Sequence, residues 1–326
     1  MLLHKSRNAV AALLLVAATG ALAQPALEKS VVDGWMKELS NWGRWGKTDQ
    51  AGTFNLITNA KRKAAAALVL EGYSVSLSRA ADTTPSADNA SPFGRKMLSS
   101  GVTPNPMFAM DNYSTSYHGQ SLTHLDALSH MFYQGKVYNG YPQAQINNSG
   151  AGQLDVMAFQ SGFFSRGILI DMPQFRGVKY LELSTPIYPA DFDAWEKKTG
   201  IKIGPGDIVF VRTGRWARRV EKGAWDIGQA AAGMHASCAR WFKQRDVAVV
   251  GSDTHGELQP SGVKGVPFPL HQLLIVAMGT PMIDNCDLEA LSVAAAQRKR
   301  WEFLITAAPL TVPGGTGSPL NPIAIF

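Results

Sequence analysis

The sequence predicts an α/β fold, a single compact domain in which a mixed β-sheet is flanked by helices. Two observations lead to this prediction. Nearly continuous apolar runs of strand length, such as 207–214, are typical of strands that are covered on both faces. These runs alternate with helical patterns that end at glycine, which favours parallel strands joined by helices. Hairpin-like segments also occur, so we expect part of the sheet to be antiparallel.

The N-terminal third is expected to hold two helices and one strand. An amphipathic helix is predicted within 31–46, where it runs into a loop of glycine and tryptophan, and a second helix over 59–72 should close at Gly72. Residues 73–79 alternate between apolar and polar side chains, as a strand does. The next stretch, 80–106, is rich in Pro, Ser, Asp and Asn and is expected to be a long surface loop.

The rest of the chain alternates between strands and helices. Strands are predicted over 166–172, 207–214, 247–253 and 300–310. Helices are predicted over 189–200, 235–246 and 271–279. This order is typical of a sheet whose faces are covered by the intervening helices.

A cationic segment followed by an apolar run opens the chain. Lys5 and Arg7 precede the apolar run 9–23, which ends in small residues and is shorter than the roughly 20 residues that span a bilayer. We therefore expect a signal peptide over 1–23, cleaved near Ala23, and a mature domain over 24–326. The product would be periplasmic or secreted. No later run is long and apolar enough to suggest a membrane partner.

The charge balance limits the classes of partner. The formal net charge is +6, and the basic residues are scattered apart from the run 298–300. Proteins that bind nucleic acid usually gather their basic residues on one face or helix. We therefore expect no nucleic-acid partner.

The chain has two cysteines, Cys238 and Cys286. Each lies among apolar residues, a context typical of a buried free thiol. An oxidising compartment would permit one disulfide between them, and their spacing does not decide between these states.

Three histidines and an aspartate gather in "YHGQSLTHLDALSH" (117–130), although the chain has only seven histidines. If 117–126 is a strand, then His118, Gln120, His124 and Asp126 share one face, because side chains at i, i+2 and i+4 do so. His130 follows on the turn beyond. Imidazole and carboxylate groups that face one way suit zinc, manganese or iron. A structural role would require a separate hydrogen-bond partner for each buried imidazole, which makes it the less favoured interpretation.

Two further features have open interpretations. Trp42 and Phe132 could line a substrate pocket for a planar compound, although packing is the commoner role of aromatic side chains. In "GSDTHGELQP", the residues Asp253, His255 and Glu257 alternate just after a buried strand, where active sites of α/β proteins gather. They could instead cap the end of that strand.

The segment "THLDALSH" (123–130) resembles the His-x-Gly-Thr-His-x-Asp-x-Pro-x-His signature of the putative-cyclase family, metal-dependent hydrolases that include bacterial kynurenine formamidase and isatin hydrolase. Other segments resemble landmarks of that family in the same order: "NWGRWGKTDQAGTFNLIT", "GDIVFVRTGRW", "VVGSDT", "HQLLIVAMGTPMIDNCDLEAL" and the C-terminal "FLITAAPLTVPGGTGSPLNPIAIF". Together they cover most of 40–326. The resemblance implies a partly barrel-like sheet and a site for one or two divalent metal ions, Zn²⁺ or Mn²⁺.

The resemblance also implies roles for individual residues. His124 and Asp126 match the signature's metal-binding histidine and aspartate, and His130 matches its final histidine, which acts in the family as an acid/base. His271 matches a ligand of a second metal. Asp284 stands where the family usually has glutamate, so its shorter side chain makes its reach to a second metal uncertain.

Gln120 departs from the signature, because it replaces the first histidine. An amide oxygen is a weaker ligand than imidazole, so with Gln120 as a ligand the metal would be held more loosely or would be a harder ion such as manganese. His118 or His255 could supply a missing donor, which leaves open whether one metal or two are bound.

The resulting hypothesis is a metal-dependent hydrolase that cleaves an amide or lactone bond in a small cyclic or aromatic compound, with His130 as acid/base. Two alternatives stay open at this point. One is a cyclase or dehydratase that uses the same metal site, and the other is a periplasmic small-molecule-binding protein without catalysis. A homodimer or a higher homo-oligomer is compatible with exposed aromatic residues near the pocket.

Overall fold

The computed structural model describes residues 26–326. The predicted signal peptide lies outside the described residues. None of the helices within 26–326 combines the length and the apolar character of a membrane-spanning segment.

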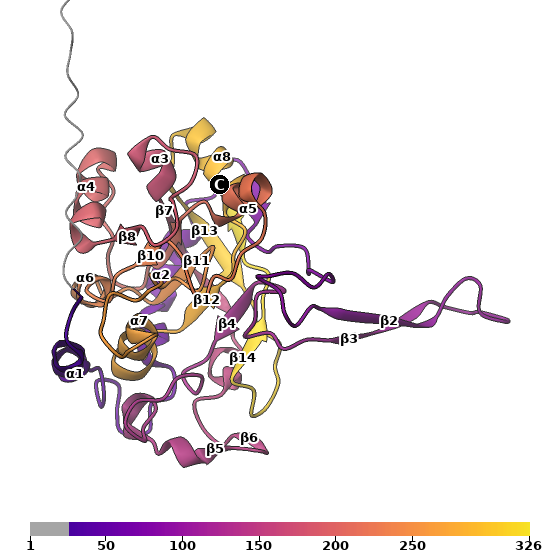
Figure 1. Cartoon of the computed structure of the whole chain (residues 1–326), viewed down its shortest axis with the longest axis horizontal. Helices are drawn as coiled ribbons and strands as arrows, with labels where there is room; N and C mark the ends of the chain where they lie inside the picture. Colours follow the sequence, from indigo (N-terminus) through magenta and orange to yellow (C-terminus); the bar gives the residue numbers. More distant parts are fainter. Residues whose placement is uncertain (1–25) are drawn as a thin grey trace, which may run out of the picture.

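One sheet of nine strands forms the framework of the molecule (Figure 1). Its central strands are parallel: β7 (Phe163–Asp171), β9 (Ile208–Arg212), β11 (Val249–Ser252) and β12 (Met282–Asp284). Every residue of β9, β11 and β12 is buried, as expected for strands covered on both faces.

Antiparallel strands extend this sheet on both sides. On one side lie β13 (Glu302–Ala307), β15 (Ile323–Ile325) and β1 (Ser74–Ser76), and on the other lie β4 (His124–Asp126) and β14 (Gly317–Pro319). The sheet curls into a half-barrel with helices around it. The predicted α/β fold with a mixed, partly barrel-like sheet is confirmed.

The helices begin and end where capping groups allow. For example, α4 starts at Pro189, and the Tyr188 N–H donates to Asp191 Oδ2 at 2.8 Å in its first turn. It ends at Gly200, whose φ of 76° is a left-handed conformation that favours glycine. The longer helices are α1 (Lys29–Glu38), α2 (Asn59–Ala66), α4 (Pro189–Thr199), α5 (Arg215–Lys222), α6 (Cys238–Gln244) and α8 (Glu289–Arg298).

Short elements complete the chain. The one-turn helices are α3 (Met172–Arg176), η1 (Gly52–Leu56), η2 (Tyr138–Gly140), η3 (Gln143–Gln145) and η4 (Val156–Phe159). Two small ladders pair β8 (Pro186–Ile187) with β10 (Gly233–Met234) and β5 (Ile146–Asn147) with β6 (Gly150–Ala151).

The helix predicted over 59–72 is shorter in the structure, because α2 ends at Ala66 and does not reach Gly72. Two other predicted elements outside the histidine cluster differ in type. The α-helix expected over 271–279 consists of α7 (Pro269–His271) followed by the π-helix η5 (Gln272–Met278), a rare form that is frequent at functional sites. The loop expected over 80–106 contains the strand β2 (Gly94–Ser99), which pairs with β3 (Met110–Ser114) in a hairpin that projects from the body (Figure 1). Because β2 is mostly exposed, its sequence lacks the apolar pattern of a core strand.

Both cysteines are free thiols in the core. Cys238 and Cys286 are fully buried and are not bonded to each other. The buried free-thiol interpretation is confirmed, and the disulfide alternative is wrong.

Candidate metal centre

Two paired strands place three polar side chains side by side. In the antiparallel register of β4 and β12, His124 lies opposite Asp284, and Asp126 lies two residues further along the same face. All three side chains are buried at the end of the parallel strands, where the sheet would otherwise be apolar. The sheet itself therefore brings these three groups together.

The strand expected over 117–126 is wrong, because β4 covers only His124–Asp126. Residues 117–123 form turns, so Gln120 does not share a strand face with Asp126. The Gln120 Oε1 atom accepts a hydrogen bond from Arg215 Nη1 at 2.8 Å. Its predicted role as a metal ligand is therefore not supported by this geometry, in which its oxygen has another partner.

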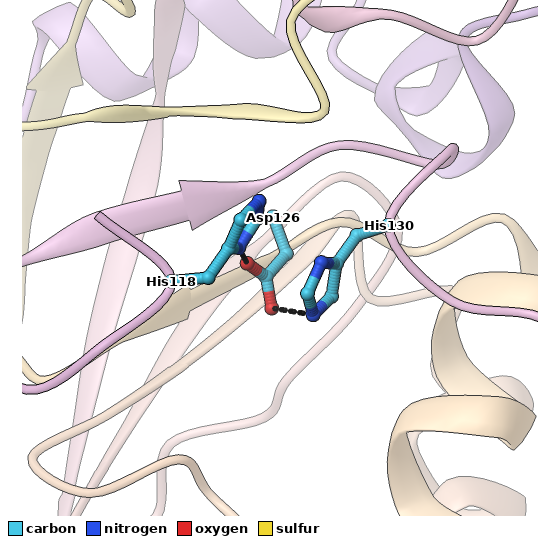
Figure 2. Close-up of side chains that lie close together, drawn as sticks. All are labelled: His118, Asp126 and His130. Atoms are coloured by element: carbon cyan, nitrogen blue, oxygen red, sulfur yellow. Dashed lines mark hydrogen bonds and ion pairs between the residues drawn. The ribbon is translucent and has the colours of Figure 1, made fainter. Parts of the chain in front are cut away.

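His118 lies in the same turn segment as Gln120, and its side chain contacts Asp126. Its Nδ1 is 2.7 Å from Asp126 Oδ1, and its Nε2 is 2.9 Å from Thr316 Oγ1. The His118 ring also stacks on the His130 ring, with centroids 3.9 Å apart (Figure 2). Both nitrogens of His118 are thus partnered, a geometry that suits holding Asp126 and His130 in place.

His130 follows β4 on a turn and points back toward Asp126 (Figure 2), with Nε2 3.7 Å from Asp126 Oδ2. Desolvation lowers the pKa of His130 to about 4, although the charge of Asp126 acts in the opposite direction. At neutral pH the imidazole is therefore uncharged, and one ring nitrogen can accept a proton.

Asp126 is the common centre of this group. Burial would raise the pKa of Asp126, but the charge of His130 and the hydrogen bond from His118 outweigh it and hold the pKa well below its usual range. The carboxylate is therefore ionised, and ionised carboxylates are what divalent metals require as ligands.

His271 enters from α7 at the start of the π-helix. Its Nδ1 is 2.7 Å from Glu257 Oε2, and its Nε2 is 3.5 Å from Asp284 Oδ2 and 3.9 Å from Asp126 Oδ2. If His271 donates its Nδ1–H to Glu257, the lone pair on Nε2 faces two carboxylates. This arrangement is repulsive unless a proton or a cation lies between them. Burial lowers the pKa of His271, but Asp284 and Glu257 outweigh it and raise the pKa well above its usual value.

Asp253, His255 and Glu257 alternate after β11, and the structure gives them different roles. One of them caps a turn, and the other two lie at the site. Asp253 caps the neighbouring turn, because it accepts hydrogen bonds from the backbone N–H groups of Thr213, Gly214 and Arg215. Glu257 holds His271, as the carboxylate partner of a metal-binding histidine commonly does. His255 faces the cavity.

The donor set fits a divalent metal. The ligand atoms of His124, Asp126 and Asp284 lie within 4.8 Å of one another, and so do those of His118, Asp126 and His130. Asp284 Oδ1 and His255 Nδ1 are buried without a hydrogen-bond partner among the described residues. Buried polar atoms in this state usually indicate a missing ion or water.

A cavity of about 390 Å³ lies beside these side chains, although His124 and Asp126 are not part of its lining. Its lining includes Gln120, His130, His271, Asp284 and the aromatic ring of Phe268. Histidines and aspartates face a lining that is otherwise largely apolar, a composition usual for small-molecule sites.

The two aromatic residues predicted to bind substrate lie elsewhere. Trp42 donates its Nε1–H to the Val276 carbonyl at 2.7 Å and lines a separate surface hollow. Phe132 is 39% exposed and does not line the cavity either. A substrate role for them is therefore not supported by this cavity, and Phe268 supplies the aromatic wall instead.

The sequence interpretation missed the arginines that hold the cavity wall. Arg215 is only 2% exposed and donates to Asp88 Oδ2 at 3.1 Å and to Gln120, both of which line the cavity. Arg219 donates to the same Asp88 carboxylate at 2.8 Å. The available signal was Arg215, which directly follows the predicted strand 207–214, because a charge so close to a core strand needs a partner.

Comparisons with known proteins find solved structures of similar fold. A crystal structure described as a novel cyclase is 32% identical, covers 89% of this chain and 98% of its own, and superposes with a TM-score of 0.78. Isatin hydrolase A from Ralstonia solanacearum is 22% identical, covers 77% of this chain and 91% of its own, with a TM-score of 0.56. Isatin hydrolase A from Labrenzia aggregata, bound to benzyl benzoate, is 21% identical, covers 77% and 93%, with a TM-score of 0.55.

The two isatin hydrolases share the fold at this level of identity. No curated protein matches the chain. A family model described as putative cyclase matches residues 50–257, well over half of the chain. The match includes the histidine cluster of β4 and ends at Glu257, the partner of His271. The chain therefore belongs to the putative cyclase family.

Proposed function

We propose that this protein is a metal-dependent hydrolase that cleaves the amide or lactone bond of a small cyclic or aromatic compound. One observation carries the proposal. Imidazoles and carboxylates from β4, β12 and α7 lie close together beside one cavity, and among the described residues Asp284 Oδ1 and His255 Nδ1 are buried there without a hydrogen-bond partner. The isatin hydrolases that share the fold support an amide substrate.

His124, Asp126 and Asp284 would hold the metal, with His271 as a further donor. A divalent metal acts as a Lewis acid that polarises a carbonyl and lowers the pKa of water. Glu257 fixes the His271 ring so that Nε2 faces the carboxylates. Zn²⁺ and Mn²⁺ both suit this set of nitrogen and oxygen donors.

His130 would move the proton. It is uncharged at neutral pH and lies beside Asp126, so a ring nitrogen can take a proton from the attacking water and pass it to the departing nitrogen or oxygen. A cyclic substrate would give a ring-opened carboxylate that carries the freed amine or hydroxyl, and an acyclic amide would give a separate carboxylate and amine. The stacked ring of His118 keeps the His130 imidazole in one orientation.

The test combines metal analysis with a substrate panel. The purified protein is dialysed, analysed for bound metal, and assayed with isatin, dihydrocoumarin, formanilide and succinimide, with and without a chelator. We expect bound divalent metal, hydrolysis of at least one compound, loss of activity with the chelator and its return when metal is added back. A fully active preparation without metal would refute the proposal.

A further inference from the structure

The side-chain amide of Gln120 has a fixed orientation. Its partner, Arg215 Nη1, can only donate, so the atom that accepts at 2.8 Å must be the amide oxygen. The amide nitrogen, Nε2, is left on the other side. Within residues 26–326 this Nε2 donates to no protein group, and Gln120 lines the cavity.

A buried network holds this orientation in place. The Arg215 guanidinium is almost fully buried and also donates to Asn285 Oδ1 and to Asp88 Oδ2. Asn285 in turn donates its Nδ2 to the Gln120 carbonyl at 2.9 Å and to the Leu122 carbonyl at 3.0 Å. Asn285 therefore holds the backbone of Gln120 directly and holds the Arg215 side chain that binds the Gln120 amide oxygen.

The charges around the cavity indicate what the free N–H could bind. Among the described residues, the lining contains carboxylates and imidazoles but no lysine or arginine. Asp88 is neutralised by two arginines behind the wall, whereas Asp284 and Asp226 bring negative charge to the lining. Asp126 and Asp284 would compensate the charge of the proposed metal, and the described lining offers no lysine or arginine to pair with an anionic substrate, so the amide N–H suits a neutral compound that presents a carbonyl oxygen.

We propose that Gln120 determines specificity by donating its Nε2–H to a second carbonyl oxygen of a neutral substrate, next to the bond that is cleaved. Arg215 and Asn285 are positioning residues that keep the amide oxygen away from the cavity and the amide nitrogen facing it. This inference rests on the proposed hydrolase function. The substrate class is a cyclic compound with two carbonyl groups, such as an imide or a vicinal dicarbonyl lactam.

Variants of Gln120 test this role with two compounds. Isatin has two adjacent carbonyls, whereas dihydrocoumarin has one, the scissile carbonyl itself. For Gln120→Leu we expect kcat/KM for isatin to fall about tenfold, the effect of one neutral hydrogen bond, while that for dihydrocoumarin stays within about twofold. Gln120→Glu should lower the isatin value further, because an acceptor then faces the carbonyl. Bound metal per chain should equal that of the unaltered protein in both variants.

A matched control is Gln174→Leu. Gln174 also accepts a hydrogen bond, from Trp301 Nε1 at 3.2 Å, but lies in a surface hollow away from the cavity. This variant should leave both substrates unaffected. Loss of metal in Gln120→Leu would identify Gln120 as a ligand, and an equal loss for both compounds would identify a structural role. Either result would overturn the inference.

Failure of the proposed function can be told apart from failure of the inference. If the unaltered protein hydrolyses none of the compounds, the hydrolase proposal fails, and isatin binding is then measured directly by calorimetry. The inference still requires about tenfold weaker isatin binding by Gln120→Leu than by the unaltered protein and by Gln174→Leu. Equal affinities, or no isatin binding at all, would refute it.

Discussion

The floor and the wall of the cavity are held by different forces, although the short segment 117–130 contributes residues to both. The floor, His124 and Asp126 with Asp284, stands on paired strands whose backbone ladder fixes every side chain. The wall, Gln120 with Asp88, stands on turns and is held by the side chains of Arg215 and Arg219. A backbone ladder survives the change of a side chain, whereas a side-chain network does not.

This difference predicts distinct outcomes for substitutions. Changes in the floor should remove metal or chemistry while the fold persists. Changes in the wall should reduce stability or affinity while the metal stays bound.

The largest effect is expected for Asp126→Asn. Asp126 contacts His118, His124, His130 and His271, and the amide removes the charge that a cation needs. We expect bound metal and hydrolysis both to fall at least about 100-fold, because loss of a direct ligand should exceed the 10- to 100-fold cost of losing an outer partner. Elemental analysis and turnover check this, and circular dichroism should be unchanged. Retention of metal would place the site elsewhere.

His130→Ala should separate chemistry from metal binding. The imidazole is placed to move a proton, so kcat should fall by about two to four powers of ten while the metal content stays the same. Metal analysis and steady-state kinetics on the same preparation measure both. Unchanged kcat would refute the acid/base role, and loss of metal would assign His130 to the ligand set instead.

Glu257→Gln should weaken metal binding to a smaller extent. Glu257 Oε2 lies 2.7 Å from His271 Nδ1, the ring nitrogen that faces away from the proposed metal, and so orients the ring. Such partners typically contribute about 10- to 100-fold in metal affinity. Competition with a chelator of known affinity measures the change. An unaltered metal affinity would mean that His271 is not a ligand.

The smallest effect on metal binding is expected for Asp88→Asn in the wall. The substitution removes the charge that pairs with Arg215 and Arg219, and hydrogen bonds to charged groups contribute about 2 kcal/mol. We expect the free energy of unfolding in urea to fall by about that amount, with bound metal unchanged. A loss of metal together with unaltered stability would contradict the claim that the wall contributes to stability and the floor to metal binding.

The sequence by itself determined the α/β class and most core elements, because apolar runs such as 207–214 and capped helices such as 189–200 carry their signals locally. It also marked His124, Asp126 and His130, which lie close together in the chain and share a motif. His124 and Asp126 share one strand and His130 follows on the next turn, so the chain itself keeps the three close together.

Only the tertiary structure decided the partners of these residues. The pairing of β4 with β12 set Asp284 beside His124, and α7 brought His271 to Glu257. The turn at 117–123 places Gln120 where it accepts a hydrogen bond from Arg215. The two residues are 95 positions apart, so no local sequence pattern predicts this contact. Contacts of this kind depend on strand order and on the pairing of buried charges, and both are settled only when the chain is packed.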